Sequence, residues 1–158
     1  MLWKMVNEWV NTKRSTHQHL LLNTLADATY VIAPKFISVG EYVFLDWGNE
    51  NLYLYESYNE PDNEKIATEA QENHVHLFEY VPKNCQKDVK AISIAIAKNL
   101  LSCLKREFPH KKFAVILQLQ YADSVIIRFH QIRKGCALYI DPNDHKQAYA
   151  QGEIILFR

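Results

Sequence analysis

The sequence predicts an α+β fold, in which a mostly antiparallel sheet is combined with N-terminal helices and one long central helix packed on it. Apolar residues recur at helical spacing near the N-terminus and again between Asn84 and Pro109. Elsewhere they recur at period two in runs joined by short turns, which favours hairpins over parallel crossover units. The length of 158 residues is close to the common size of one domain, so we expect a single globular domain over residues 1–158.

The N-terminal part contains two apolar patterns that predict two helices, or one broken helix. The polar residues 12–18 separate the two patterns. The apolar positions at helical spacing are Leu2, Met5, Val6, Trp9, Val10, Leu21, Leu22, Leu25 and Ala28.

Runs of β-branched and aromatic residues follow and predict strands. They are TYVIAPKFISV, EYVFLDW and NLYLYES, and the turn at residues 48–50 predicts a hairpin between the last two. Pro34 predicts that the first strand is an edge strand or contains a bulge. The polar residues 59–72 predict a loop or a short exposed helix, and HVHLFEYV predicts the next strand.

The clearest predicted element is a helix that Asn84 can cap and that Pro109 ends. Lys105 and Arg106 lie in its last turn, where cations interact favourably with the helix dipole. Its apolar positions form a wide stripe and place the helix at the centre of the core: Val89, Ile92, Ile94, Ile96, Ala97, Leu100, Leu101 and Leu104.

The C-terminal third predicts further strands. Period-two runs over residues 113–119 and 125–129 predict a second hairpin, with its turn at residues 121–124. We also expect a short strand over residues 136–140 and a terminal strand over residues 154–157.

Composition and cysteine usage exclude several classes of protein. The chain is 48% hydrophobic and 23% charged, which is typical of a folded domain, and it contains neither a signal-peptide pattern nor an apolar run that could span a membrane. Cys85, Cys103 and Cys136 are too widely spaced for a zinc motif or a disulfide framework. We therefore expect a cytoplasmic protein with reduced thiols, no membrane association, and a monomeric or weakly dimeric state.

No catalytic, nucleotide-binding or metal motif is recognisable. The pairs His17/His19 and His74/His76 have the spacing that some metal sites require on a strand, but neither has a third ligand at a fixed distance in sequence. No phosphate loop or nucleophile motif occurs. We expect no metal, no cofactor and no enzymatic activity.

The net charge of zero conceals a strong asymmetry along the chain. Residues 41–80 contain ten acidic residues and the single base Lys65, a net charge of −9, whereas residues 81–158 carry +7. Side chains that often anchor protein interfaces occur in the same acidic segment: Tyr42, Trp47, Tyr53, Tyr55, Tyr58 and Tyr80. Two interpretations remain open. Either the acids solvate one face of a domain whose tyrosines pack in the core, or the segment is an interface that attracts a basic partner.

Two alternative functions also remain open. The basic C-terminal half would suit a nucleic-acid-binding or regulatory module, and in a strand Arg128 and His130 would share a face. Against this, the pI is about 7.0 and the aromatic residues lie mostly in the acidic half, so nucleic acid is the less favoured partner. A small hydrolase would need a concave pocket that holds titratable residues with perturbed pKa values.

Two segments resemble the bacterial immunity proteins of contact-dependent inhibition and related polymorphic toxin systems. They are EYVFLDWGNENLYLYESYNEPDNE and VIIRFHQIRKGCALYIDPNDHKQAY. The resemblance implies a protein that binds one cognate toxin domain, commonly a basic nuclease, and blocks its active site or substrate path. In such a surface we expect charge from six acids and anchoring from three aromatic residues: Asp46, Glu50, Glu56, Glu60, Asp62 and Glu64, with Trp47, Tyr55 and Tyr58.

Overall fold

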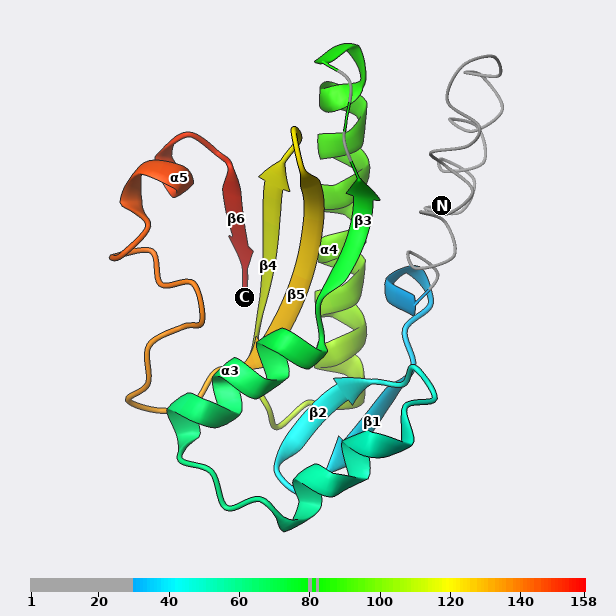
Figure 1. The fold of residues 1–158 in the computed structure, drawn as a ribbon, viewed down its shortest axis with the longest axis vertical. Coiled ribbons are helices and arrows are strands. Elements are labelled where there is room, and N and C mark those ends of the chain that lie inside the picture. Colours follow the sequence, from blue (N-terminus) through cyan, green and yellow to red (C-terminus); the bar gives the residue numbers. More distant parts are fainter. Residues whose placement is uncertain (1–29, 80, 82) are drawn as a thin grey trace.

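The computed structural model describes residues 30–79, 81 and 83–158. Its strands are β1 (Phe36–Val39), β2 (Tyr42–Leu45), β3 (Val75–Glu79), β4 (Phe113–Gln120), β5 (Ser124–Gln131) and β6 (Ile154–Phe157). The main sheet is antiparallel throughout, in the order β3-β5-β4-β6, and β1 pairs with β2 in a separate two-stranded sheet (Figure 1). The predicted α+β class is confirmed, whereas the predicted N-terminal helices lie outside the described residues.

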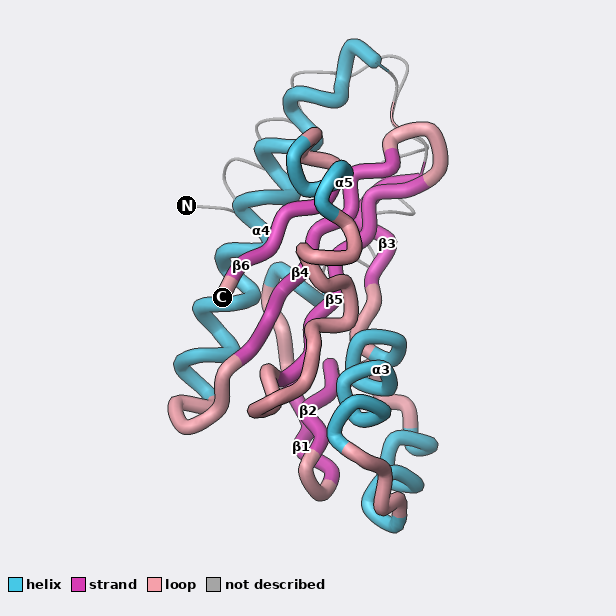
Figure 2. Tube along the Cα trace, turned by 90° about the vertical axis from the view of Figure 1, so that its left-hand side faces the viewer, coloured by secondary structure: helices cyan, strands magenta, loops and turns pink. Residues whose placement is uncertain are grey.

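The long helix α4 (Gln86–Glu107) packs along one face of the main sheet, as predicted (Figures 1 and 2). Its apolar stripe meets the odd-numbered side chains of β4 and β5, and together they form the largest core cluster. Asn84 does not cap it, because this residue lies inside the short 3-10 turn η2 (Lys83–Cys85) and Cys85 occupies the cap position. The helix ends before Pro109, where the N–H of Phe108 donates to the carbonyl of Leu104.

The C-terminal strands agree with the period-two pattern in two places and differ in one. The β4–β5 hairpin and β6 are confirmed, and β6 pairs with β4 from Val115↔Phe157 to Gln118↔Ile154. The predicted strand over residues 136–140 is wrong, because this segment forms turns beside the sheet and pairs with no strand. The short helix α5 (Lys146–Ala150) follows it and was not predicted.

The first hairpin forms one run earlier than predicted. β1 and β2 pair across a turn at Gly40, which has a φ of +56° that favours glycine. β1 begins only after Pro34, so the proline lies outside the strand. The run NLYLYES is not a strand but the 3-10 helix η1 (Glu50–Ser57), which Asn49 caps by accepting a hydrogen bond from the N–H of Asn51.

The polar segment expected to be a loop or an exposed helix is the helix α3 (Asp62–Glu72), and one of its faces is buried. α3 contacts both β2 and β5, so it joins the small sheet to the main sheet (Figure 1). The main sheet therefore has one face covered by α4, while α3 and the segment that contains α5 lie on the other side (Figure 2).

Two further features concern the class of protein. The cysteines Cys85, Cys103 and Cys136 are free. Within the part of the chain that the structure describes, no helix is both long and apolar enough to cross a bilayer.

Candidate protein-binding surface

The acidic, tyrosine-rich segment supplies a 3-10 helix whose two sides differ. On η1, Leu52 is buried against the small sheet, whereas Tyr53 and Leu54 are 58% and 59% exposed. Tyr58, at the end of the helix, is 48% exposed. Leu52 and Leu54 would share a face in the predicted strand, but they differ in exposure here because a 3-10 helix does not alternate its side chains as a strand does.

An aromatic cluster beneath η1 holds the helix on the hairpin. The ring of Tyr55 lies 5.5 Å from that of Tyr42 and 5.3 Å from that of Phe44, between ring centroids. Tyr58 meets Tyr55 edge-on at 5.2 Å. Such tilted and edge-to-face contacts are favourable for aromatic rings. Tyr55 therefore has a packing role, and its neighbours Tyr53 and Leu54 face outward instead.

Two carboxylates of the acidic segment accept hydrogen bonds from these tyrosines. The hydroxyl of Tyr42 donates to Glu60 and that of Tyr55 to Glu72, each at 2.8 Å. Burial, together with these hydrogen bonds, raises the pKa of Tyr42 above its usual value and that of Tyr55 to about 12. Glu60 also accepts from the hydroxyl of Thr68 at 3.0 Å, so it serves the fold.

The most buried acid of the segment is Glu69 of α3, whose exposed fraction is 0%. Its Oε2 accepts from the Arg133 guanidinium and from the backbone N–H of Gln131, both at 2.8 Å. Its Oε1 accepts from the N–H of Val43 at 3.0 Å and from the side-chain amide of Gln131. One carboxylate thus joins α3, the hairpin and the end of β5.

Asn73, just after α3, completes this junction. Its Oδ1 accepts from the N–H of Leu45 at 2.8 Å, and its Nδ2 donates to the carbonyl of Val43 at 2.9 Å. The edge of β2 is thereby paired with side chains in place of another strand.

Further ion pairs surround the junction. Lys65 pairs with Glu41 and with Asp62, and Arg133 lies 3.7 Å from the same Asp62. The hydrogen bond from Lys65 holds the pKa of Glu41 below its usual value. Several acids of residues 41–80 are therefore paired with bases. One of these bases, Arg133, comes from the basic C-terminal part of the chain.

The structure separates the nine predicted partner-binding residues into groups. Glu50, Glu56 and Tyr58 lie exposed on η1 or at its end, and Glu64 is exposed on α3. Tyr55, Glu60 and Asp62 take part in the packing, hydrogen bonds and ion pairs described above. The exposed Tyr53 and Leu54 lie outside the nine predicted site residues, although Tyr53 is one of the aromatic residues of the acidic segment. We define the η1 surface as Glu50, Tyr53, Leu54, Glu56 and Tyr58.

Asp46 and Trp47 lie directly after β2, in a different setting. Asp46 is exposed and accepts from the N–H of Gly48 at 3.1 Å. Trp47 is half-buried, with its ring 4.6 Å from that of Tyr30. Both line a hollow of about 480 Å³ with Lys35 and others. Trp47 also packs against the main core, so part of its ring area is already used by the fold.

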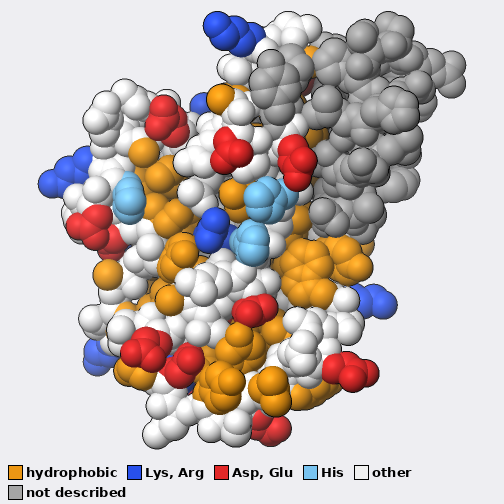
Figure 3. Space-filling model, viewed as in Figure 1, with side chains coloured by type: hydrophobic (Ala, Val, Ile, Leu, Met, Phe, Trp, Pro, Cys, Tyr) orange, Lys and Arg blue, Asp and Glu red, His pale blue; other side chains and the backbone are white. Residues whose placement is uncertain are grey.

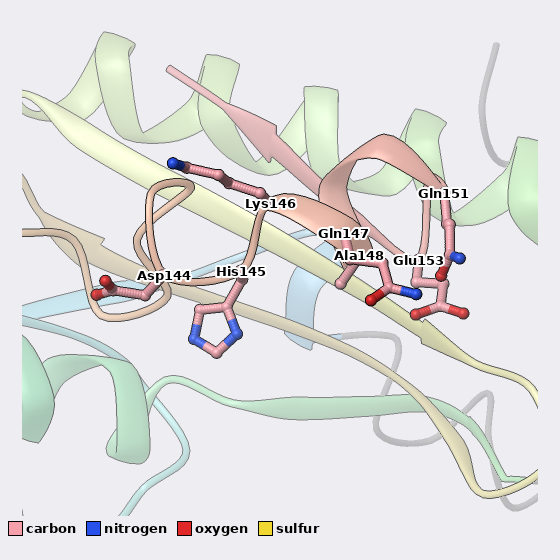
Figure 4. Close-up of a pocket in the computed structure, with 7 residues that line it drawn as sticks. All are labelled: Asp144, His145, Lys146, Gln147, Ala148, Gln151 and Glu153. Carbon is pink, nitrogen blue, oxygen red and sulfur yellow. The ribbon is translucent and has the colours of Figure 1, made fainter.

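A second hollow, of about 320 Å³, lies at α5 (Figure 4). Its lining includes the titratable residues Asp144, His145, Lys146 and Glu153. A small hydrolase would need titratable residues of this kind to act together in a pocket. In Figure 4, however, Asp144 points away from His145, and Glu153 lies at the opposite end of the hollow. No acid and base are brought together there.

His74, His76 and His130 lie on the main sheet or next to it. Among the residues that the structure describes, no group of three or more histidine, cysteine or acidic residues is arranged to hold a metal ion, and His17/His19 lie outside them. His74 and His76 lie side by side, with ring centroids 5.5 Å apart. His130 is fully buried, and burial lowers its pKa.

Comparison with known proteins identifies a family for the chain. No curated protein and no solved structure matches the chain. A family model matches residues 4–156, and the chain belongs to the uncharacterized protein PM0498 family.

Proposed function

We propose that this chain is a non-enzymatic, protein-binding inhibitor, an immunity protein that neutralises a basic toxin domain through the η1 surface. The proposal rests on the resemblance of the acidic segment to immunity proteins and on the composition of the exposed surface. It requires no chemistry from this chain, because covering the partner's active site or substrate path is sufficient.

The observation that carries the proposal is the exposure of large apolar side chains on one short helix. The described residues include four exposed large hydrophobic side chains, and three of them, Tyr53, Leu54 and Tyr58, belong to the η1 surface. Large exposed hydrophobic side chains that gather in one place are typical of interaction sites, and tyrosine is enriched among the residues that dominate binding energy.

The charge of the surface favours a basic partner. Glu50 and Glu56 flank the exposed apolar side chains, and both are exposed. Acidic and apolar side chains alternate over the end of the molecule that holds α3 and η1 (Figure 3). Such a surface would accelerate association with a basic protein, and salt would weaken the effect. A nuclease groove suits this surface because it is built to hold phosphates and bases.

The experiment that tests the proposal starts with affinity capture by the purified chain from a lysate of the cells that make it, at low and at moderate salt. The captured protein is identified and purified, and its toxic activity, such as nucleic-acid cleavage, is measured with and without the chain. We expect a basic protein whose activity the chain inhibits in a one-to-one complex. Capture of nucleic acid alone, or of a protein whose activity is unaffected, contradicts the proposal.

Matched charge variants locate the surface. In one variant Glu50 and Glu56 of the η1 surface are replaced by lysine, and in the control the exposed acids Glu107 and Asp123 are replaced in the same way. Both variants have the same net charge, so a difference between them reports the position of the charges. We expect the first to weaken binding by about 10- to 100-fold and the control by about threefold or less. Equal losses would mean that the η1 surface is not the binding site.

A further inference from the structure

The face of the main sheet opposite α4 carries a cluster of basic side chains that lies outside the η1 surface. Arg128 lies on β5, and the register places Ile126 of the same strand opposite His76 of β3. His74 comes directly before β3, so the same register places it beside Arg128. Figure 3 shows a basic side chain and histidine side chains next to one another near the middle of this face.

The charge of Arg128 is poorly compensated by the protein. Its side chain is half-buried, and its Nη1 donates to the carbonyl of Ala70 at the long distance of 3.5 Å. Its Nε is buried and has no hydrogen-bond partner among the described residues. The ion pairs of the described chain involve Lys65 and Arg133, and Arg128 takes part in none of them. Burial lowers the pKa of Arg128, and an interaction with Tyr139 offsets only part of this shift.

The neighbouring arginine on the same stretch of chain shows what full compensation looks like. Arg133 donates from Nη1 to the buried carboxylate of Glu69 at 2.8 Å and lies near Asp62. Partial burial of a guanidinium without such a partner is unfavourable, because the desolvation is not offset by an opposite charge. Arg128 is therefore a cation that a bound anion would stabilise.

The surroundings of Arg128 orient it. Its guanidinium carbon lies 5.3 Å from the centre of the Tyr139 ring, and the buried His130 fixes that segment by accepting from the N–H of Tyr139 at 3.3 Å. The buried Nε–H of Arg128 is a donor without an acceptor among the described residues, which indicates that the protein alone does not complete this site.

We propose that this face binds an oxyanion of the phosphate class, held by Arg128 with the rings of His74 and His76 beside it. The planar guanidinium presents several N–H groups in a geometry that matches phosphate and carboxylate oxygens. The Nδ1 of His74 contacts the carbonyl of Gln71, so its Nε2 and the ring nitrogens of His76 are the imidazole atoms that remain for contact with the anion. The site takes an anion whereas the η1 surface takes a basic partner, so the two proposals stand or fall separately.

The test is a titration of the whole chain with inorganic phosphate at constant pH and ionic strength. The NMR signals of the histidine rings report the binding. We expect saturable shifts of the His74 and His76 signals and no shift of the exposed His110, which lies in the turn after α4. Acetate in a parallel titration distinguishes a carboxylate ligand from phosphate, and saturable shifts with acetate but not with phosphate overturn the proposal of a phosphate-class ligand. Shifts that chloride reproduces, or that do not saturate, overturn the proposal.

Two variants assign the binding to Arg128. Arg128→Gln removes the charge, and we expect phosphate affinity to fall by about tenfold or more, whereas the control Arg106→Gln, at an exposed position on α4, leaves it unchanged. His76→Gln keeps a polar side chain and tests the site if the first variant does not fold, with an expected loss of about threefold. Phosphate affinity that survives in the folded Arg128→Gln chain, or in His76→Gln where that variant is the one tested, overturns the assignment.

Discussion

Two regions built from the same acidic, tyrosine-rich segment use its side chains in different ways. At the junction of α3 with the hairpin, Glu69 and Asn73 are buried, and each of these two side chains has more than one hydrogen-bond partner. On the η1 surface, Glu50 and Glu56 are exposed beside exposed apolar side chains. Composition is therefore not enough to identify an interface, because the partners of each acid decide whether it serves the fold or remains available to another molecule.

The largest effect that would sharpen this comparison is expected at Glu69. Replacing Glu69 by alanine leaves Arg133 without its buried partner and removes the acceptor of two backbone N–H groups, those of Val43 and Gln131. We expect the free energy of unfolding, measured by urea denaturation, to fall by about 3–5 kcal/mol. Stability should fall because the Glu69 carboxylate links β2 of the small sheet to β5 of the main sheet.

A matched substitution on the same helix is the control. Glu64 is exposed in the first turn of α3, so Glu64→Ala loses only a favourable interaction with the helix dipole, about 0.5 kcal/mol. If Glu69→Ala destabilises the chain no more than Glu64→Ala does, the distinction between structural and exposed acids fails.

A smaller effect is expected at Tyr55, which lies between the two regions. Tyr55→Phe removes the hydrogen bond to Glu72 and keeps the ring, so we expect a loss of about 1 kcal/mol at neutral pH. In the folded chain the pKa of Tyr55 is raised to about 12, above about 10 for an unfolded tyrosine. The neutral form is thus favoured by folding, and this contribution is present below pH 10 and is lost as the pH rises through about 12.

The pH dependence of unfolding checks this assignment. Between pH 10 and 12 we expect stability to fall less steeply in Tyr55→Phe than in the unaltered chain, although other buried tyrosines such as Tyr42 keep part of the slope. Identical slopes in the two proteins would show that Tyr55 titrates as it does when exposed.

Much of the main sheet could be predicted from the sequence, because its elements have strong and undisturbed periods. The stripe on α4 has apolar residues at spacings of three and four, and the odd-numbered apolar side chains of β4 and β5 pack in one core cluster with that helix. Local pattern and tertiary packing agree there, so the sequence pattern was sufficient.

The regions that were predicted wrongly are those where local pattern and packing disagree. NLYLYES has the composition of a strand, yet Asn49 caps a 3-10 helix and the aromatic side chains pack on the hairpin. Helix α3 looks polar because its buried face contains Glu69, whose partners Gln131 and Arg133 come more than 60 residues later. Contacts at that separation leave no local signal in the sequence.

The candidate site could be predicted only in part for the same reason. The acidic, aromatic segment was identified, but the sequence did not show that Tyr55 packs inward while Tyr53 and Leu54 face outward. A helical spacing of three, which places Leu52 and Tyr55 on one side of η1, is the signal that would have separated them.

The smallest effect on stability is expected on the η1 surface itself, and it would complete the comparison. Leu54 is 59% exposed, so Leu54→Ser removes little buried area, and we expect the free energy of unfolding to change by no more than about 0.5 kcal/mol. The same change should weaken binding of the captured toxin domain, because an apolar contact at the centre of an interface is lost. Leu52→Ser is the control, since Leu52 is buried and its loss should destabilise the chain by about 2–5 kcal/mol. A large loss of stability in Leu54→Ser would mean that this side chain belongs to the core, and the η1 surface would then lose its main apolar contact.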